Sequence, residues 1–219
     1  MILLAFDCST SGCSAALMAE GRVLARGEAQ AGASQSEALM PLLARVMAEG
    51  GLAWTSLGLI GVTVGPGSFT GVRIGLSAAR GLALALGIEV AGIGTADALA
   101  AGVPASEQGE RPILVAIDGK RADLFVQAFD ARLAPLGPVA AMMPEDAARL
   151  LPGPPLLVGD GAARLAALMP GAIPSAAPSR PDPAVLAELA ARRFAEGTAL
   201  APEPLYLRSA DVTLPGVRP

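Results

Sequence analysis

The N-terminal part of the chain alternates short apolar runs with polar turns. Apolar stretches at Ile2–Phe6, Cys13–Met18 and Val23–Glu28 are separated by turn residues at 9–12 and 20–21. Runs of this length between Ser-rich and Gly-containing breaks are typical of strands joined by tight turns. The pattern therefore predicts three consecutive strands in an antiparallel meander.

After this meander the apolar spacing changes to that of a helix. Ser34, followed three residues later by Glu37, fits a capping box and predicts a helix start. The next apolar residues recur at i, i+3, i+4, i+7 and i+8, the spacing of one helix face. They are Leu39, Leu42, Leu43, Val46 and Met47. Gly50 and Gly51 end this predicted helix.

A glycine-rich segment, Gly65–Gly75, joins a predicted buried strand at Leu59–Val64 to a second helix at Thr70–Leu86, with Gly87 as its left-handed cap. Such a junction can hold an anion, because the first N–H groups of a helix have no partners within it. The segment nevertheless matches neither of two standard phosphate-binding motifs. Thr70 stands where the dinucleotide motif needs glycine, and no Lys-Ser/Thr pair follows as in a Walker loop.

The second half of the chain repeats the first. Leu114–Asp118 echoes Leu3–Asp7, and each run is followed by a polar turn and another predicted strand. A polar stretch with Pro and Gly at residues 102–112 predicts a boundary. We therefore predict two related lobes, an N-terminal lobe over residues 1–103 and a smaller C-terminal lobe over residues 104–219.

The remaining elements alternate between strand and helix, which is the pattern of an α/β protein. Strands are predicted at Glu89–Ile93, Asp123–Phe129 and Pro155–Val158, and helices at Thr95–Ala101, Glu145–Leu151, from Gly161 to Met169 and at Pro183–Glu196.

Composition narrows the classes of function. The 219 residues include 53% hydrophobic but only 3% aromatic residues, which predicts a compact core of small side chains. A formal net charge of −4 argues against nucleic-acid binding by the chain alone, because phosphate contacts need clustered Lys and Arg. The chain contains no histidine, which excludes a Ser-His-Asp triad, a Cys-His pair and a His-ligated zinc site.

The apolar N-terminus and the cysteine content indicate a cytoplasmic protein. Asp7 interrupts the first apolar run, and no positive region precedes it, unlike a signal peptide. The apolar run Leu82–Val90 is too short for a membrane span. Cys8 and Cys13 are too few for a disulfide framework and are expected to be reduced and packed near the first strands. We expect a soluble protein without membrane contact.

Several segments, taken in order, resemble the TsaB/YeaZ family. They are Phe6–Thr10, Ser34–Glu37, Gly65–Gly75, Ile117–Asp118 with Arg121, Gly159–Gly161 and Leu205–Arg208. The glycine-rich segment is the most specific of them. The resemblance implies a duplicated ribonuclease H-like fold with two lobes, that of the actin-like ATPase superfamily. The chain departs from the family at Gln35, where His is usual, and at Cys8, where Thr is usual.

The resemblance also implies a function. It implies a catalytically silent scaffold that dimerises with the paralogue TsaD to support threonylcarbamoylation of the adenosine next to the anticodon of tRNA. The chain would contact the ATPase TsaE and tRNA only as part of that complex, and the chain alone would form a homodimer. A self-sufficient ATP-dependent phosphotransferase of the same fold is the alternative. A peptidase, after the M22-like label given to such proteins, is a third hypothesis.

We expect no catalytic residue, metal or cofactor, and leave weak nucleotide binding open. We hypothesise that the loops at the ends of the first and fourth predicted strands form a vestigial nucleotide-binding loop. It comprises Asp7, Ser9, Thr10, Gly65, Gly67, Ser68 and Thr70. The alternative, which we favour, is that Asp7 only caps its turn through nearby N–H groups. Asp118 with Lys120 and Arg121 is likewise interpreted as a solvated turn.

A stripe of small residues on the second helix predicts close approach by another helix. Gly71, Gly75 and Ala79 recur every four residues, and they pack either on the chain's own sheet or on a partner. We favour a partner, TsaD or a second copy. The predicted partner-binding residues are Leu39, Leu42, Leu43, Val46, Gly71, Val72, Gly75, Ala78 and Ala79. Tyr206 and Arg208 either dock on a partner or hold the C-terminus on the chain itself.

Overall fold

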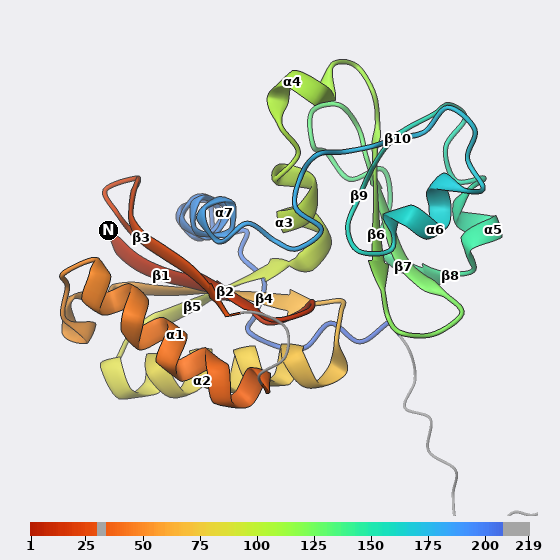
Figure 1. Ribbon diagram of the computed structural model, residues 1–219. Helices are drawn as coiled ribbons and strands as arrows, with labels where there is room; N and C mark the ends of the chain where they lie inside the picture. Colours follow the sequence, from red (N-terminus) through yellow and green to blue (C-terminus); the bar gives the residue numbers. More distant parts are fainter. Residues whose placement is uncertain (30–33, 208–219) are drawn as a thin grey trace, which may run out of the picture.

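A computed structural model describes residues 1–29 and 34–207, which form two five-stranded mixed sheets (Figure 1). The strand order is β3-β2-β1-β4-β5 in the first sheet and β10-β9-β6-β7-β8 in the second. The order along the chain places the whole first sheet before the second. The sheets are therefore formed by successive halves of the chain.

The first sheet contains the predicted meander. β1 (Ile2–Asp7), β2 (Cys13–Ala19) and β3 (Arg22–Ala29) pair antiparallel, while β4 (Leu59–Gly65) and β5 (Glu89–Gly94) run parallel to β1. A short 3-10 turn, η1 (Trp54–Ser56), precedes β4.

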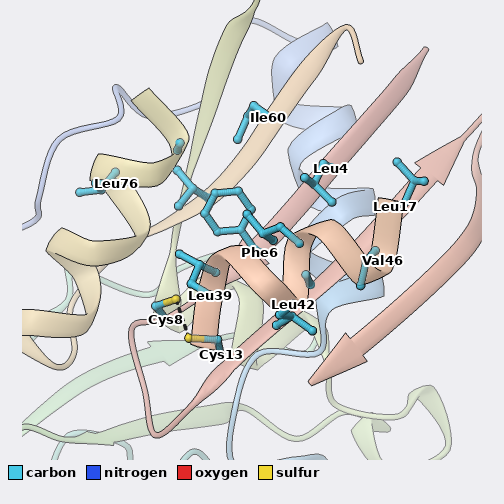
Figure 2. Packing of buried hydrophobic residues seen from close by; sticks show 14 of the residues in the cluster. Leu4, Phe6, Cys8, Cys13, Leu17, Leu39, Leu42, Val46, Ile60 and Leu76 are labelled. Carbon is cyan, nitrogen blue, oxygen red and sulfur yellow. Dashed lines mark hydrogen bonds between the residues drawn. The ribbon is translucent and has the colours of Figure 1, made fainter. Parts of the chain in front are cut away.

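Two long helices cover one face of this sheet. α1 (Gln35–Glu49) and α2 (Phe69–Leu86) lie side by side beneath it in Figure 1. Their apolar stripes meet the inward side chains of the strands, among them Leu4, Phe6 and Ile60, in the core that Figure 2 shows. The helical periodicity read from the sequence thus identifies the side of each helix that is buried.

The second sheet is built around β6 (Ile113–Asp118). β7 (Leu124–Phe129) and β8 (Ala140–Met142) extend it antiparallel on one side, and β9 (Leu156–Val158) and β10 (Ile173–Pro174) extend it parallel on the other. Two short helices, α5 (Pro144–Ala147) and α6 (Ala162–Ala166), cover one face, and α4 (Ala105–Gln108) lies on the link between the sheets.

The two sheets share one topology. The second sheet, taken as β8-β7-β6-β9-β10, has the order and strand directions of β3-β2-β1-β4-β5, with α5 and α6 in the places of α1 and α2. The predicted α/β fold of two duplicated lobes is therefore confirmed. The division between residues 103 and 104 stays a prediction.

A third helix from each half links the two sheets. α3 (Thr95–Ala101) follows the first sheet but buries Leu99 against the second, while α7 (Pro183–Ala195) follows the second and buries Leu186 against the first. The Arg193 guanidinium of α7 lies 2.7 Å from the Asp97 carboxylate of α3. The halves are thus tied together by helices that each packs on the other's sheet.

Two local predictions are wrong, and two strands were missed. Ser34 is the N-cap residue of α1, as predicted, but its side chain makes no capping bond, and its hydroxyl lies 2.6 Å from that of Ser36 instead. The helix predicted at Glu145–Leu151 is the single turn α5, and Pro152 shortly after it disfavours helical backbone at Leu151. The strands β8 and β10 were missed, because runs of three and two residues are too short to show a hydrophobic periodicity.

Within the described part of the chain, α2 is the one helix with the length and hydropathy of a membrane span. It has 18 residues and a mean hydropathy of 1.2. Its buried side packs on the first sheet, and the core helices of soluble proteins meet the same criterion.

Candidate functional site

A cleft of about 520 Å³ opens between the lobes, where the central strands β1 and β6 end. The first lobe contributes the loop after β1 and the starts of α1 and α2, and the second contributes the loop after β6 and Asp160. The lining residues are Ser9, Thr10, Ser11, Gly12, Gln35, Ser68, Phe69, Thr70, Ile117, Asp118, Gly119, Lys120 and Asp160.

Asp7, at the end of β1, is sealed inside the first lobe at 2% exposure. Its Oδ1 accepts hydrogen bonds from the Ser9 N–H at 2.8 Å, the Ser9 hydroxyl at 2.5 Å and the Thr63 hydroxyl at 2.6 Å. Its Oδ2 accepts one from the Thr10 hydroxyl at 3.2 Å. This is a turn-capping arrangement, and four internal donors leave the carboxylate little capacity for a metal–phosphate complex.

The glycine-rich loop is closed by the chain itself. The Ser68 N–H donates to the Ser9 carbonyl at 2.7 Å, and the Gly71 N–H donates to the Ser68 hydroxyl at 3.2 Å. A Cβ on Gly67 would collide with the Ser9 carbonyl, and one on Gly71 would collide with the Cys8 carbonyl. The backbone after β1 therefore packs directly on the start of α2.

Gln35 fixes the loop after β1 from the start of α1. Its Nε2 lies 3.0 Å from the Cys8 carbonyl oxygen, 3.0 Å from that of Thr10 and 2.7 Å from that of Gly12. A single amide thus holds the first lobe's wall of the cleft in shape.

The second lobe's wall carries paired charges. Asp160 accepts a hydrogen bond from the Asp118 N–H at 2.8 Å, and the Lys120 ammonium lies 3.5 Å from Asp118 and 3.8 Å from Asp160. Burial raises the pKa of the Asp160 carboxyl. The Arg164 guanidinium of α6 lies 3.5 Å from the Asp118 carboxylate. The turn at Asp118 is solvated at Lys120, whose side chain is 75% exposed, and it also carries a network of ion pairs.

The charge of the cleft does not suit a polyphosphate. Among its lining residues Lys120 is the sole cation, and two carboxylates neutralise it. The described residues contain no group of three His, Cys, Asp or Glu side chains placed to hold a metal. The cleft offers hydroxyl and amide groups, but no unpaired positive charge for a phosphate.

The residues predicted to bind a partner lie within the chain's own core. Leu39, Leu42, Leu43, Val46, Gly71, Val72, Gly75 and Ala79 are buried between α1, α2 and the first sheet, and Ala78 is half-buried beside them. A Cβ on Gly75 would lie 3.6 Å from both the Cys8 Cβ and a Val62 methyl group. The small stripe therefore lets α2 approach its own sheet, the alternative that we favoured less. A partner-binding role for the two helices stays a prediction.

A different set of residues faces outward from these helices. This outer face consists of the exposed residues Met40, Ala44 and Ala48 of α1 and Ser77, Gly81 and Leu84 of α2. Leu84 is 87% exposed, and nothing lies within 4 Å of a Cβ built on Gly81. These six residues are uncharged and Gly81 adds no bulk, which suits close helix packing, and the exposed charged residues Arg45, Glu49, Arg73 and Arg80 lie among them on the same two helices.

The C-terminal tail returns to α2. The Leu205 N–H donates to the Val64 carbonyl at 2.8 Å, and the Tyr206 hydroxyl accepts from Arg73 Nε at 2.9 Å. The Arg73 guanidinium also stacks on Phe69, 3.4 Å from the ring centroid. Tyr206 therefore holds the tail on the chain itself, against the first lobe, and Arg208 lies outside the described residues. The sequence did not indicate Phe69 and Arg73 as the partners of Tyr206, because 133 residues separate Arg73 from Tyr206.

Comparison with known proteins identifies relatives across most of the chain. The family model "TsaD: tRNA N6-adenosine threonylcarbamoyltransferase" matches residues 29–158. An uncharacterized protein of Mycobacterium tuberculosis is 33% identical over 95% of this chain and 92% of its own length. The tRNA threonylcarbamoyladenosine biosynthesis protein TsaB of Escherichia coli is 33% identical over 125 residues, which are 57% of this chain and 53% of that protein.

A solved structure supports the same relation. YeaZ from Pseudomonas aeruginosa superimposes with a TM-score of 0.79 at 28% sequence identity, over 94% of this chain and 99% of that one. Both lobes and the helices that link them are therefore features shared with that protein.

Proposed function

The chain belongs to the TsaB/YeaZ family of the actin-like ATPase superfamily, and from this we propose that it is a non-catalytic scaffold in tRNA threonylcarbamoylation. In this proposal it acts by dimerising with a TsaD paralogue. Relatives named tRNA threonylcarbamoyladenosine biosynthesis protein TsaB support a role in that pathway.

The observation that carries the scaffold proposal is the internal closure of the first lobe's strand ends. Asp7 accepts four hydrogen bonds from its own lobe, and the backbone at Cys8 and Ser9 packs on Gly71 and Gly67. The vestigial nucleotide loop proposed at Asp7, Ser9, Thr10, Gly65, Gly67, Ser68 and Thr70 is thus braced by its own contacts. The hydrogen-bond donors around Asp7 are already used within the lobe. They therefore stabilise the fold and are not free to bind a phosphate group for transfer.

The outer face of α1 and α2 is the proposed surface for TsaD. Residues 29–158 match the TsaD family model, so a TsaD protein carries counterparts of both helices. Two paralogues that present the same pair of helices can pack about a pseudo-twofold axis, in the way that two copies of one chain form a symmetric dimer. We therefore place the TsaD paralogue on this face, and a second copy of the chain when TsaD is absent.

The net charge supports indirect contact with RNA. At a formal net charge of −4, the chain lacks the clustered cations that grip phosphates. In the proposal tRNA and the TsaE ATPase are bound through the complex with TsaD.

Two alternative activities fit the site less well. A phosphotransferase needs cationic groups that contact the phosphates of its substrate, whereas Lys120 of the cleft is neutralised by Asp118 and Asp160. A peptidase needs a general base or a metal ligand set, and the chain has no histidine.

Gly81→Leu tests the proposed surface. A Cβ at this exposed position has no atom of the chain within 4 Å, and leucine is a better helix former than glycine, so the fold should survive and gain up to about 1 kcal/mol. Binding to TsaD and self-association should each fall at least about tenfold, which is about 1.4 kcal/mol. Sedimentation measures association, and circular dichroism measures folding.

Ala195→Leu is the matched control, because it places the same side chain at an exposed residue of α7. It should leave both associations unchanged. Unaltered TsaD binding by folded Gly81→Leu would refute the proposed surface. Metal-dependent ATP hydrolysis by the purified wild-type chain alone, retained in the variant, would refute the scaffold role.

A further inference from the structure

Two thiols face each other beneath the first lobe's wall of the cleft. Cys8 follows β1 and Cys13 begins β2, and both are free. Strand register pairs Asp7 with Ser14, so the two cysteines are the next residues opposite each other. Their Sγ atoms lie 3.0 Å apart and point toward one another at the edge of the core (Figure 2).

This placement is close to the geometry of a disulfide. Directly opposed residues of antiparallel strands have Cβ atoms about 4.5–5.5 Å apart, and a disulfide brings them to about 3.5–4.5 Å with sulfurs about 2.0 Å apart. Closing the gap takes a shift of about 1 Å and no change of strand register. Gly12, at a φ of 91°, stands in the connecting loop and can absorb such a shift.

We propose that Cys8 and Cys13 form a redox-active dithiol that exchanges with external disulfides of the glutathione class. The product is an intramolecular disulfide that closes the loop of residues 9–12. This loop supplies Ser9, Thr10, Ser11 and Gly12 to the wall of the cleft.

The exchange proceeds in two balanced steps. The Cys13 thiolate attacks one sulfur of the external disulfide, which forms a mixed disulfide and releases one thiolate. Cys8 then loses its proton and attacks the Cys13 sulfur, which forms the Cys8–Cys13 bond and releases the second thiolate. Two electrons pass to the external disulfide, and the two cysteine protons end on the two released thiols.

The order of attack follows from the hydrogen bond between the thiols. The Cys8 S–H donates to the Cys13 sulfur, which lowers the pKa of Cys13 and raises that of Cys8. Cys13 is therefore the attacking thiol and Cys8 the resolving one. Both residues are at most 2% exposed, so the first step requires the loop to open.

Formation of the disulfide would affect the starts of both long helices. The Cys8 carbonyl accepts a hydrogen bond from Gln35 at the start of α1 and packs on Gly71 in the first turn of α2. A disulfide at Cys8 would tether this carbonyl, and with it the junction of loop, α1 and α2. The oxidised chain should therefore hold the wall of the cleft more rigidly than the reduced chain.

The test equilibrates the full chain in glutathione buffers of graded oxidation. One sample starts from reduced native protein and the other from protein refolded in oxidised buffer, and agreement between them defines equilibrium. Unfolding in the presence of an alkylating reagent, with intact-mass and peptide analysis, then counts free thiols and locates any disulfide. Hydrogen exchange follows the amides of residues 9–12.

We expect a Cys8–Cys13 disulfide without mixed or interchain products, and at least a tenfold slowing of exchange in the loop. Cys13→Ser should keep one alkylatable thiol and show no change in exchange. Two free thiols at every buffer ratio, or a stable mixed disulfide as the end product, would overturn the proposal.

Discussion

The two lobes share a strand order but not their helices. α1 and α2 have 15 and 18 residues, whereas their counterparts α5 and α6 have 4 and 5. At 1.5 Å per residue, α2 runs about 27 Å along its sheet, while α6 makes little more than one turn. Strand topology therefore survives without long helices. Under the proposed function, this difference in helix length explains why the first lobe carries the proposed partner surface.

The strand-end aspartates show a second difference. Asp7 and Asp118 occupy the same place in the two sheets, at the ends of β1 and β6. Asp7 is sealed by hydroxyl and amide donors, whereas the Asp118 side chain is 24% exposed and lies near Lys120 and Arg164. Equal positions in a duplicated fold thus carry different roles, because their surroundings differ.

Replacing these aspartates should give the largest contrast. Asp7→Ala leaves the buried hydroxyls of Ser9 and Thr63 without their acceptor and should lower the free energy of unfolding by roughly 3–5 kcal/mol. Asp118→Ala removes solvent-screened ion pairs and should cost less than about 1 kcal/mol. Urea denaturation followed by circular dichroism compares the two variants. Equal losses would mean that the two positions are equivalent after all.

A pair of glycines at the ends of β4 and β9 gives the next contrast. Gly65 and Gly159 have φ angles of 100° and 102°, so alanine is similarly strained at both. A Cβ on Gly159 would collide with the Ala116 carbonyl, whereas one on Gly65 meets only atoms 3.5 Å away or more. Gly159→Ala should cost about 2–3 kcal/mol and Gly65→Ala about 1 kcal/mol. Thermal unfolding of both variants measures the difference, and a costlier Gly65→Ala would contradict it.

The contact between α3 and α7 tests how strongly the lobes are coupled. Asp97→Ala breaks the 2.7 Å contact with Arg193 and should cost about 1–2 kcal/mol, because both side chains are largely buried. Glu49→Ala, which breaks the exposed 3.8 Å pair with Arg45 on α1, is the control and should cost less than about 0.5 kcal/mol. If the exchanged helices couple the lobes, the Asp97 variant should unfold with separated transitions of the two lobes. A single unchanged transition would count against that coupling.

The smallest expected effect is a pH dependence in the second lobe. Burial raises the pKa of Asp160 above its value in the unfolded chain, so between the two values the folded state holds a proton that the unfolded state has lost. The wild type should therefore lose stability as pH rises through this window, with a slope of at most about 1.4 kcal/mol per pH unit. Asp160→Asn should lack this slope. Denaturation curves recorded across the acidic range compare the two, and parallel pH profiles would exclude the effect.

Much of the fold could be predicted from local pattern. The short apolar runs and the turn residues between them indicate the meander, and the i, i+3, i+4 spacing from Leu39 identifies the buried face of α1. The echo of Leu3–Asp7 in Leu114–Asp118 predicts the duplication. The candidate site was predicted less well. The residues of the glycine-rich loop were identified, but not that the Cys8 and Ser9 carbonyls would close it.

The sequence by itself determined the order of the elements, the duplication and the absence of histidine chemistry, because these depend on residue type and short-range spacing. Tertiary structure alone decided which surface each apolar stripe covers. The stripe at Gly71, Gly75 and Ala79 is equally suited to a sheet or to a partner helix, and it is the sheet that meets it. Tertiary structure likewise placed Gln35 on three carbonyls and packed α3 and α7 on each other's sheet. Periodicity shows that a face must be buried, whereas the long-range packing of the whole chain selects what buries it.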